Sequence, residues 1–172
     1  MPPRDWASEL TAYAESKLAQ NLAQIARCTA MLTPAELWHR ASQTCNSVGN
    51  LLLHLEGNVR QWILGGVGGQ PVTRDRPAEF SARGGPSGAE LLAKLEGTTR
   101  AACELLRNRG PNELLEHRLI QGYDVSELVA VTHVVEHFSF HTGQIVHMTK
   151  ALRGVDLSQY DAQGRNVQPG LP

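Results

Sequence analysis

The chain has 172 residues, a length typical of one ordinary domain that buries its own hydrophobic core. Apolar residues make up 41% and charged residues 19%, which excludes a disordered tail, and no apolar run reaches the roughly 20 residues of a membrane span. A net charge of −1 provides no general attraction to nucleic acid or anionic lipid, so we expect neither a nucleic-acid nor a membrane partner. Residues 1–10 hold no apolar signal core, and we therefore expect a cytoplasmic protein.

The first half of the chain shows helical periodicity, and strand signals are weak throughout. A first long helix is expected from Asp5 to about Met31, with apolar positions at Leu10, Tyr13, Leu18, Leu22 and Ile25. After it, Thr33 is predicted to cap a short helical turn, with Pro34 at the first position and Glu36 closing a capping box.

A second long helix is expected from a cap at Ser47 to Leu64, where Gly65 and Gly66 end it. Residues 65–88 are rich in Pro, Gly and Arg, which predicts a long irregular crossover of the kind usually kept for a functional or topological reason. The arginines of this crossover are expected to be solvated rather than to line a pocket, and they are Arg74, Arg76 and Arg83.

The second half of the chain adds two more long helices. One is expected from Ala89 to Asn108, and the other from a cap at Ser126 or Asp124 to Arg153. Residues 112–124 suit either a short helical or an extended piece, and residues 156–172 are expected to lie on the surface. The pattern predicts an all-α fold, a four-helix bundle with long crossover connections, in a single domain over residues 1–172.

The three cysteines are odd in number and widely spaced, and none belongs to a CxxC pair. This spacing argues against a disulfide framework and against a cysteine zinc site. We expect Cys28, Cys45 and Cys103 to be buried structural thiols in a reducing compartment.

Histidines are the most informative residues of the last helix. Its apolar seam repeats every three or four residues, at Val131, Val134, Phe138, Ile145, Met148 and Leu152, and His141 takes one of its positions. At about 100° per residue, His137 flanks this seam, whereas His133 and His147 face elsewhere. Two histidines four residues apart can hold one metal ion, although core histidines with ordinary hydrogen bonds explain the same spacing.

Two other metal motifs compete with this pair. Residues 133–137 spell H-x-x-E-H, the inverted zinc-protease signature, with Glu136 as the base. It is disfavoured because His133 points away from the seam and little chain remains after it for a further ligand. A paired-carboxylate di-iron bundle is disfavoured because the repeated Glu-x-x-His motif is missing.

A third ligand has to come from another helix, and the candidates are His39, His54 and His117. His54 lies among leucines midway along the second long helix, near the edge of its apolar arc. His39 and His117 stand beside charged residues near element ends, where a solvated histidine is expected. His54 is therefore preferred, although periodicity alone does not decide.

Two segments carry a resemblance to a known family. Residues 46–55 read Asn-Ser-x-x-Asn-Leu-x-x-His-Leu, and residues 137–144 read His-x-x-x-His-x-Gly-Gln. In these motifs and in its helix order, the chain resembles the DinB-like superfamily, close to its YfiT-like metal-dependent members. The resemblance implies an up-down-down-up four-helix bundle, a homodimer, and a three-histidine metal site at His54, His137 and His141. Members commonly have Arg before Gly-Gln, where this chain has Thr142, so no role is expected for an Arg there.

Three neutral imidazoles leave at least one coordination position open for water or substrate. Nitrogen ligands suit several divalent ions, of which we expect zinc or nickel first and iron next. No catalytic acid or base and no organic cofactor is assigned, although Glu136, Glu56, Gln144 and Tyr123 are candidates for the site's surroundings.

Some relatives in the resembled family are thiol transferases, and others are described as hydrolases. The function predicted here is therefore a metal-dependent enzyme, of thiol S-transferase or hydrolase type, acting on a small-molecule substrate. The first alternative is a non-catalytic stress-response module that binds a metal or a small ligand. The second is a helical dimerisation domain with no metal.

Overall fold

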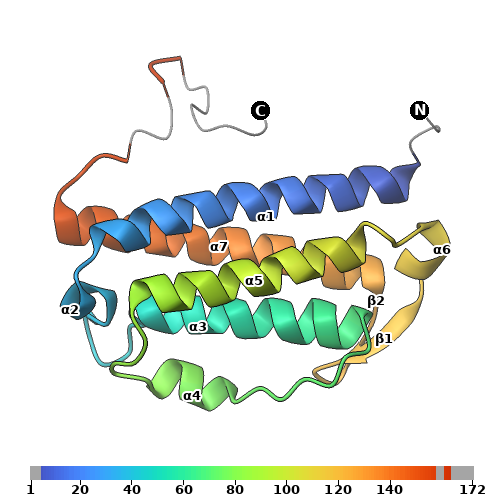
Figure 1. The fold of residues 1–172 in the computed structure, drawn as a ribbon, viewed down its shortest axis with the longest axis horizontal. Helices are drawn as coiled ribbons and strands as arrows, with labels where there is room; N and C mark the ends of the chain where they lie inside the picture. The colour runs from blue at the N-terminus through green and yellow to red at the C-terminus, as the bar shows by residue number, and fades with distance from the viewer. Residues whose placement is uncertain (1–4, 158–160, 164–172) are drawn as a thin grey trace.

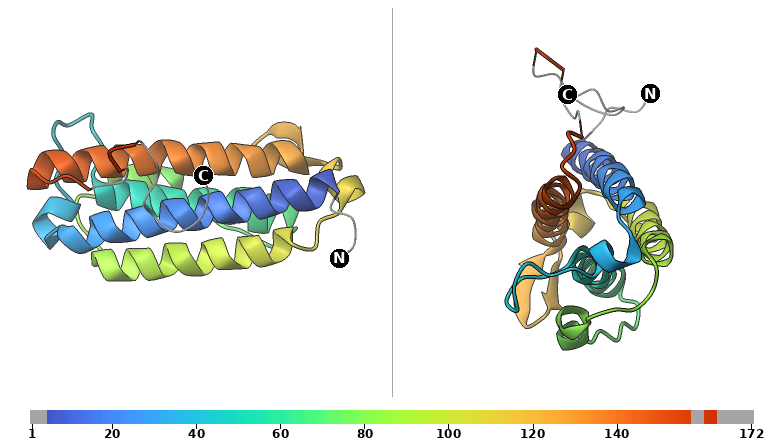
Figure 2. Two further views of the ribbon diagram at one scale, coloured as in Figure 1. Left: turned by 90° about the horizontal axis from the view of Figure 1, so that it is seen from above. Right: turned by 90° about the vertical axis from the view of Figure 1, so that its left-hand side faces the viewer.

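The computed structural model describes residues 5–157 and 161–163. Four long helices lie side by side (Figure 1): α1 (Trp6–Met31), α3 (Val48–Val59), α5 (Gly88–Leu106) and α7 (Glu127–Arg153). Both α1 and α3 contact α5 and α7, so the four helices surround one core (Figure 2). In Figure 1, α3 and α5 run in one direction, and α1 and α7 run in the other.

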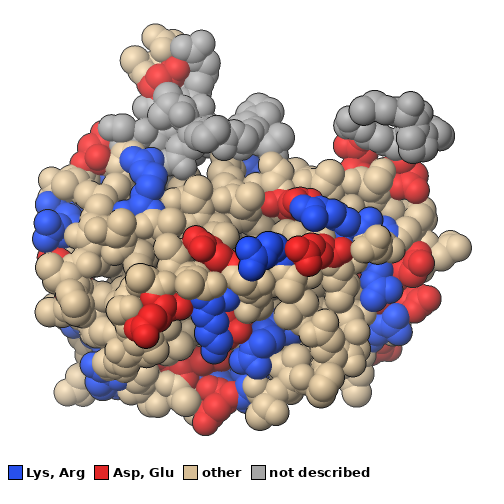
Figure 3. Space-filling view, in the orientation of Figure 1, with Lys and Arg blue, Asp and Glu red and all other residues tan. Residues whose placement is uncertain are grey.

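An all-α fold was predicted, and the structure is mainly helical with a small two-stranded sheet. The shorter elements are α2 (Pro34–Leu37), the π-helix η1 (Arg60–Val67), α4 (Arg76–Ser81), α6 (Pro111–Leu114), and the strands β1 (His117–Ile120) and β2 (Tyr123–Ser126). Among the described residues, no helix combines the length and the apolar character needed to cross a membrane. Acidic and basic side chains are interspersed over the face drawn in Figure 3.

Each long helix begins at a side-chain cap. Asp5, Ser47, Ser87 and Ser126 each accept a hydrogen bond from the backbone N–H three residues later. Two of these caps were predicted: Ser47, and Ser126 as one of two candidates. Asp5 was expected as the start of the first helix, and α5 begins at Gly88, one residue earlier than expected. The predicted capping box of α2 is also present, with Thr33 and Glu36 bonded reciprocally.

The second long helix does not end where its glycines suggest. After Val59 the helical chain continues as η1 through Gly65 and Gly66 to Val67, and Gly68 N–H donates to Ile63 O over 2.8 Å. The predicted stop at Gly65 was therefore wrong. Tertiary packing explains the glycines, because a Cβ on Gly66 would lie 2.4 Å from a side-chain carbon of Ile120 in β1.

An antiparallel hairpin that was not predicted covers η1. Its strands pair Ile120 with Tyr123 across a turn at Gln121 and Gly122, both with positive φ. Residues 112–124 thus contain both a helical piece, α6, and an extended one. Glu127, a fully buried carboxylate at the start of α7, anchors the hairpin by accepting a hydrogen bond of 2.9 Å from Arg118 Nε.

Two expectations about exposure need correction. Cys28 and Cys103 are buried as predicted, but Cys45 is exposed because it lies in the connection between α2 and α3. The chain after α7 was expected on the surface, yet Leu157 is buried and its carbonyl oxygen accepts a hydrogen bond from Arg27. Residues 158–160 and 164–172 of the same predicted tail lie outside the described residues.

Candidate metal centre

Three histidines from two helices converge between α3 and α7. His54 comes from α3, and His137 and His141 come from α7. One ring nitrogen from each lies within 4.8 Å of the others. The ring centroids are 4.4–5.1 Å apart, and His54 Nε2 lies 2.8 Å from His137 Nε2. These are the three residues that the sequence selected.

The helices place each ring in the way the periodicity suggested. His141 occupies its seam position and is 9% exposed, in line with buried Phe138 and Ile145. His137, four residues earlier on the same face, is half-buried at the edge of the seam. His54 is 4% exposed on the side of α3 that meets α7. The seam loosens toward its end, where Met148 and Leu152 are only half-buried.

The outer nitrogens of two histidines are already bound. His54 Nδ1 lies 2.9 Å from Glu79 Oε2, and His141 Nδ1 lies 2.7 Å from Gln144 Oε1. Both oxygens accept hydrogen bonds, so each Nδ1 carries a hydrogen and each Nε2 is the nitrogen left for another partner. Two Nε2 atoms at 2.8 Å must share a proton or face a common cation, because two lone pairs repel. The Nε2 side of the cluster is therefore the side suited to a metal.

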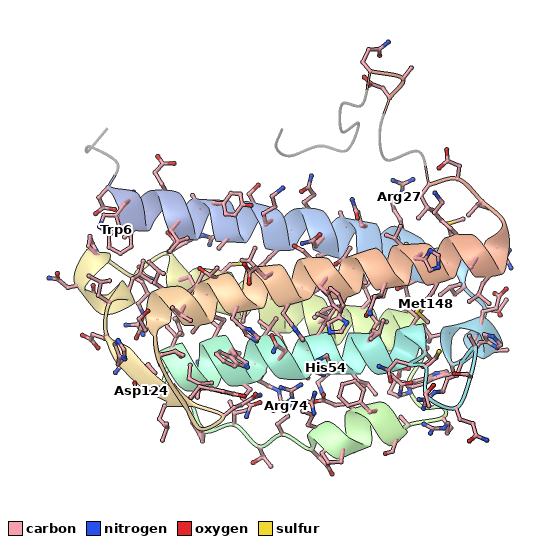
Figure 4. All side chains as sticks on the ribbon, turned by 180° about the vertical axis from the view of Figure 1, so that it is seen from behind. Trp6, Arg27, His54, Arg74, Asp124 and Met148 are labelled. Atoms are coloured by element: carbon pink, nitrogen blue, oxygen red, sulfur yellow. The ribbon has the colours of Figure 1, made fainter. Side chains whose placement is uncertain are left out.

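An ion pair holds the carboxylate of Glu79 in place. Arg74 Nε and Nη2 lie 2.6 Å and 2.8 Å from its two oxygens, and the Arg74 side chain is only 4% exposed. Burial by itself raises the pKa of Glu79, but the hydrogen bonds from Arg74 and His54 outweigh it, so the pKa lies below its ordinary value. Glu79 therefore accepts from His54 as an anion. Figure 4 shows His54 and Arg74 close together beside α3.

The crossover is fastened to α3 around this pair. Asn50 Nδ2 donates to the carbonyl oxygens of Glu79 and Ala82, over 2.8 Å and 3.0 Å. The ring of Phe80 lies 4.6 Å from that of His54. On α3, a Cβ at Gly57 would lie 2.3 Å from Glu79 Oε1, so only glycine lets the carboxylate approach this closely. The crossover thus places the carboxylate of Glu79 beside His54, which is a functional reason for such a long connection.

The imidazoles of α7 are held in the neutral form that binds metals. Burial, together with the neighbouring His141 and His54, lowers the pKa of His137 to about 3. Burial also lowers the pKa of His141, against the opposing hydrogen bond to Gln144. Neutral imidazoles are the ligand form, so these groups need not lose a charge near pH 7.

The remaining histidines stay outside the cluster, but one of them is not where it was expected. His133 was predicted to face elsewhere, yet it is half-buried against Trp62, with ring centroids 4.1 Å apart, and it stacks beside His137. Trp62 is a buried packing residue, as expected. His147 is exposed, as predicted, and His117 is exposed beside Asp124.

Sequence reasoning missed the residues that support the triad from the crossover. Arg74 was expected to be solvated, but it is buried in the ion pair with Glu79, to which no sequence pattern pointed. Of the residues predicted to surround the site, Gln144 contacts His141, whereas Tyr123 is exposed on the hairpin. An acidic residue in a long Arg-rich crossover was the available signal, but no spacing rule links it to a histidine 25 residues earlier.

The donor set fits a divalent transition-metal ion. Three imidazole nitrogens face one another, and a carboxylate and an amide fix two of the rings from outside. Carboxylate–histidine pairs of this kind orient metal ligands in proteins and raise their basicity. Three protein ligands also leave coordination positions for water or substrate.

Comparisons with known proteins bear on the family and the fold. The model of a family described as "Protein of unknown function (DUF1572)" matches residues 5–161. A conserved protein from Enterococcus faecalis has a similar structure, with a TM-score of 0.72 and 15% identity over 84% of this chain and 98% of that one. A DinB-like protein from Bacillus cereus gives a TM-score of 0.62 and 14% identity over 80% and 88%. No curated protein matches. The DinB-like resemblance is thereby confirmed at the level of the fold.

Proposed function

Since the chain belongs to the DUF1572 family, a DinB-like family, we propose that it is a metal-dependent enzyme whose His54, His137 and His141 bind one divalent ion. The substrate is a small molecule, and the reaction is the transfer of a low-molecular-weight thiol or a hydrolysis. Zinc and nickel are the first candidates for the ion, and iron is the next.

One observation carries this proposal. The Nδ1 atoms of His54 and His141 are bound by Glu79 and Gln144, so the Nε2 atoms of both rings turn inward beside His137. Histidines that only pack a core do not need hydrogen bonds at Nδ1 that direct their Nε2 atoms toward one point. A cation at this point would contact a nitrogen of each ring, and three protein ligands leave coordination positions open for a reactant.

A divalent ion at this site would act as a Lewis acid and would lower the pKa of a bound thiol or water. In thiol transfer, a thiolate sulfur forms a bond to an electrophilic carbon, the leaving group departs with its bonding pair, and solvent takes the thiol proton. In hydrolysis, a water oxygen bonds to the carbonyl carbon, and the leaving group departs with a proton. The described residues contribute by holding the outer nitrogens of His54 and His141, and burial keeps the imidazoles of His137 and His141 neutral.

Metal content of tag-free protein, measured by elemental mass spectrometry, tests the metal site. We expect about one divalent ion per chain, lost in His137→Ala and in His141→Ala while the helical circular dichroism persists. His147→Ala is the matched control, because His147 is an exposed histidine of the same helix. Retention of the ion in His133→Ala separates this triad from the H-x-x-E-H alternative. A chain that stays metal-free after reconstitution near neutral pH contradicts the proposal.

The enzyme hypothesis and the binding-module alternative differ in what the metal does. For an enzyme, the loaded protein should consume a low-molecular-weight thiol with an alkyl halide, or an ester, and His141→Ala should abolish turnover. For a non-catalytic module, the metal should be needed for folding, with no exchangeable water and no turnover. Circular dichroism of the chelated protein, together with these two assays, separates the alternatives.

We also propose the order of the helices, the assembly and the location of the protein. Four long helices around a common core support a four-helix bundle of up-down-down-up order and a single domain over residues 1–172. The family resemblance supports a homodimer, which light scattering after size-exclusion chromatography tests. The near-neutral charge supports a protein without a nucleic-acid partner, and a cytoplasmic location stays a proposal.

A further inference from the structure

A cavity of about 880 Å³ opens beside the metal centre, between the α2–α3 connection and the C-terminal half of α7. Its walls include Cys45 and Asn46 from the connection and Phe140, Gln144 and Met148 from α7. This volume lies within the range of roughly 300–1,000 Å³ that is typical of small-molecule sites. It is large enough for an organic molecule rather than a single ion.

The cavity touches the metal centre through one of its histidines. Gln144, in the wall, accepts the hydrogen bond from His141 Nδ1 through Oε1, which leaves its amide N–H groups available to a ligand in the cavity. The ring of Phe140, also in the wall, lies 5.2 Å from that of His141. A molecule in the cavity therefore lies directly behind His141 and can contact the amide that orients it.

The lining has a distinct chemical character. None of the residues that form it is Asp, Glu, Lys or Arg. Most of the surface is apolar, and it includes Phe140, which is 64% exposed although it is a large aromatic residue, and Met148, whose flexible side chain adapts to a ligand. Two histidines, His39 and His147, also line it, so the wall offers imidazoles but no carboxylate, ammonium or guanidinium group to offset the lost hydration of a charged ligand.

From these observations we propose that the cavity binds an uncharged, mainly apolar small molecule, whose hydrogen-bonding group contacts the amide of Gln144. The identification of this molecule as the substrate of the metal centre rests on the proposed function. The binding itself does not, because none of the three proposed metal ligands lines the cavity. The class of ligand follows from the absence of Asp, Glu, Lys and Arg in the wall, together with the Gln144 amide that lies beside His141.

A matched pair of fluorescent probes tests the class of ligand. N-phenylnaphthylamine is uncharged, and anilinonaphthalene sulfonate is the same skeleton with one sulfonate. We expect the uncharged probe to bind once per chain, at least about tenfold more tightly than the anionic probe. Binding of the anionic probe with equal or higher affinity overturns the proposal.

Cys45 reports where the probe sits. It lies in the wall and is exposed, whereas Cys28 and Cys103 are buried, and burial raises the pKa of the Cys103 thiol to about 11. Iodoacetamide should therefore alkylate Cys45 first, with loss of iodide, as peptide mass spectrometry can show. Saturating N-phenylnaphthylamine should slow this alkylation at least about fivefold if the probe covers the wall. An unchanged rate overturns the proposal.

A variant pair tests the wall directly. Ala151→Glu adds a carboxylate to the cavity at an exposed helical position, and Ala93→Glu makes the same change on α5, outside the cavity. We expect at least about tenfold weaker binding of the uncharged probe to Ala151→Glu only. Equal affinity in the two variants contradicts the proposal. His137→Ala should still bind the probe, so loss of the metal and loss of the cavity ligand are separate outcomes.

Discussion

At the scale of single residues, each imidazole has two nitrogens, and the hydrogen-bond partner of one nitrogen decides whether the other can bind a metal ion. Glu79 binds Nδ1 of His54, and Gln144 binds Nδ1 of His141. Arg74 keeps Glu79 ionised despite its burial. Gln144 is three residues from His141 and could be suggested from the sequence, whereas Glu79 comes from a different element and could not.

Replacement of Glu79 by Gln tests its positioning role. Glu79→Gln keeps the size of the side chain but removes the charge that pairs with Arg74 and orients His54. We expect zinc affinity, measured by calorimetry, to fall about 10- to 100-fold. Glu136→Gln, an exposed glutamate beside His137, should bind zinc as the wild type does. An unchanged zinc affinity in folded Glu79→Gln protein would show that the carboxylate does not support the site.

At the scale of elements, the crossover and α3 form one unit through a glycine. Gly57 lets Glu79 and Arg74 lie against the helix, because a Cβ would come within 2.3 Å and 2.7 Å of their polar atoms. Asn50 holds the backbone of the crossover one turn before His54. Periodicity predicted the helix, but it could not reveal what its glycine and asparagine contact.

Two glycine-to-alanine changes separate helix propensity from packing. Gly97, inside α5, has no atom within 4 Å of an added Cβ, so Gly97→Ala should raise the free energy of unfolding by roughly 0.5–1 kcal/mol. Gly57→Ala should lower it in spite of the same gain in propensity, because the ion pair must move. Urea denaturation measures both, and a stabilised Gly57→Ala protein would refute the packing argument.

A capping carboxylate ties α2 to the end of α7. Hydrogen bonds from Thr33 and from Arg153 of α7 lower the pKa of Glu36 from 4.5 to about 2. The ionised group therefore stabilises the fold above pH 4.5, and this contribution is lost as the pH falls from 4.5 to about 2.

The pH dependence of unfolding measures this contribution. Glu36→Gln keeps the shape of the capping group but cannot ionise, so wild-type protein should be the more stable of the two above pH 4.5. The difference in the free energy of unfolding should shrink between pH 4.5 and about 2. A difference that does not depend on pH would contradict the assignment.

At the scale of the whole molecule, the proposed metal ion would join α3 to α7 across the core. A ligand that binds only the folded chain stabilises it according to its concentration. Zinc at roughly 100 times its dissociation constant should therefore raise the free energy of unfolding by about 2.7 kcal/mol. Chemical denaturation with and without zinc measures this shift. His147→Ala should keep it and His137→Ala should lose it, while an equal shift in both would place the zinc elsewhere.

The sequence alone determined the presence of the long helices, two of their caps and the pair His137–His141, because these depend on contacts between residues three or four apart. Ser47, Ser126 and the pair His137–His141 are all of this kind. His54 was one of three candidates, and the family resemblance singled it out. Only the tertiary structure decided the ion pair of Arg74 and Glu79 behind His54, the fit of Ile120 over Gly66 and the cavity beside His141. Each of these joins segments far apart in the chain, and such contacts form only after the helices have packed and the connections have found their places on them.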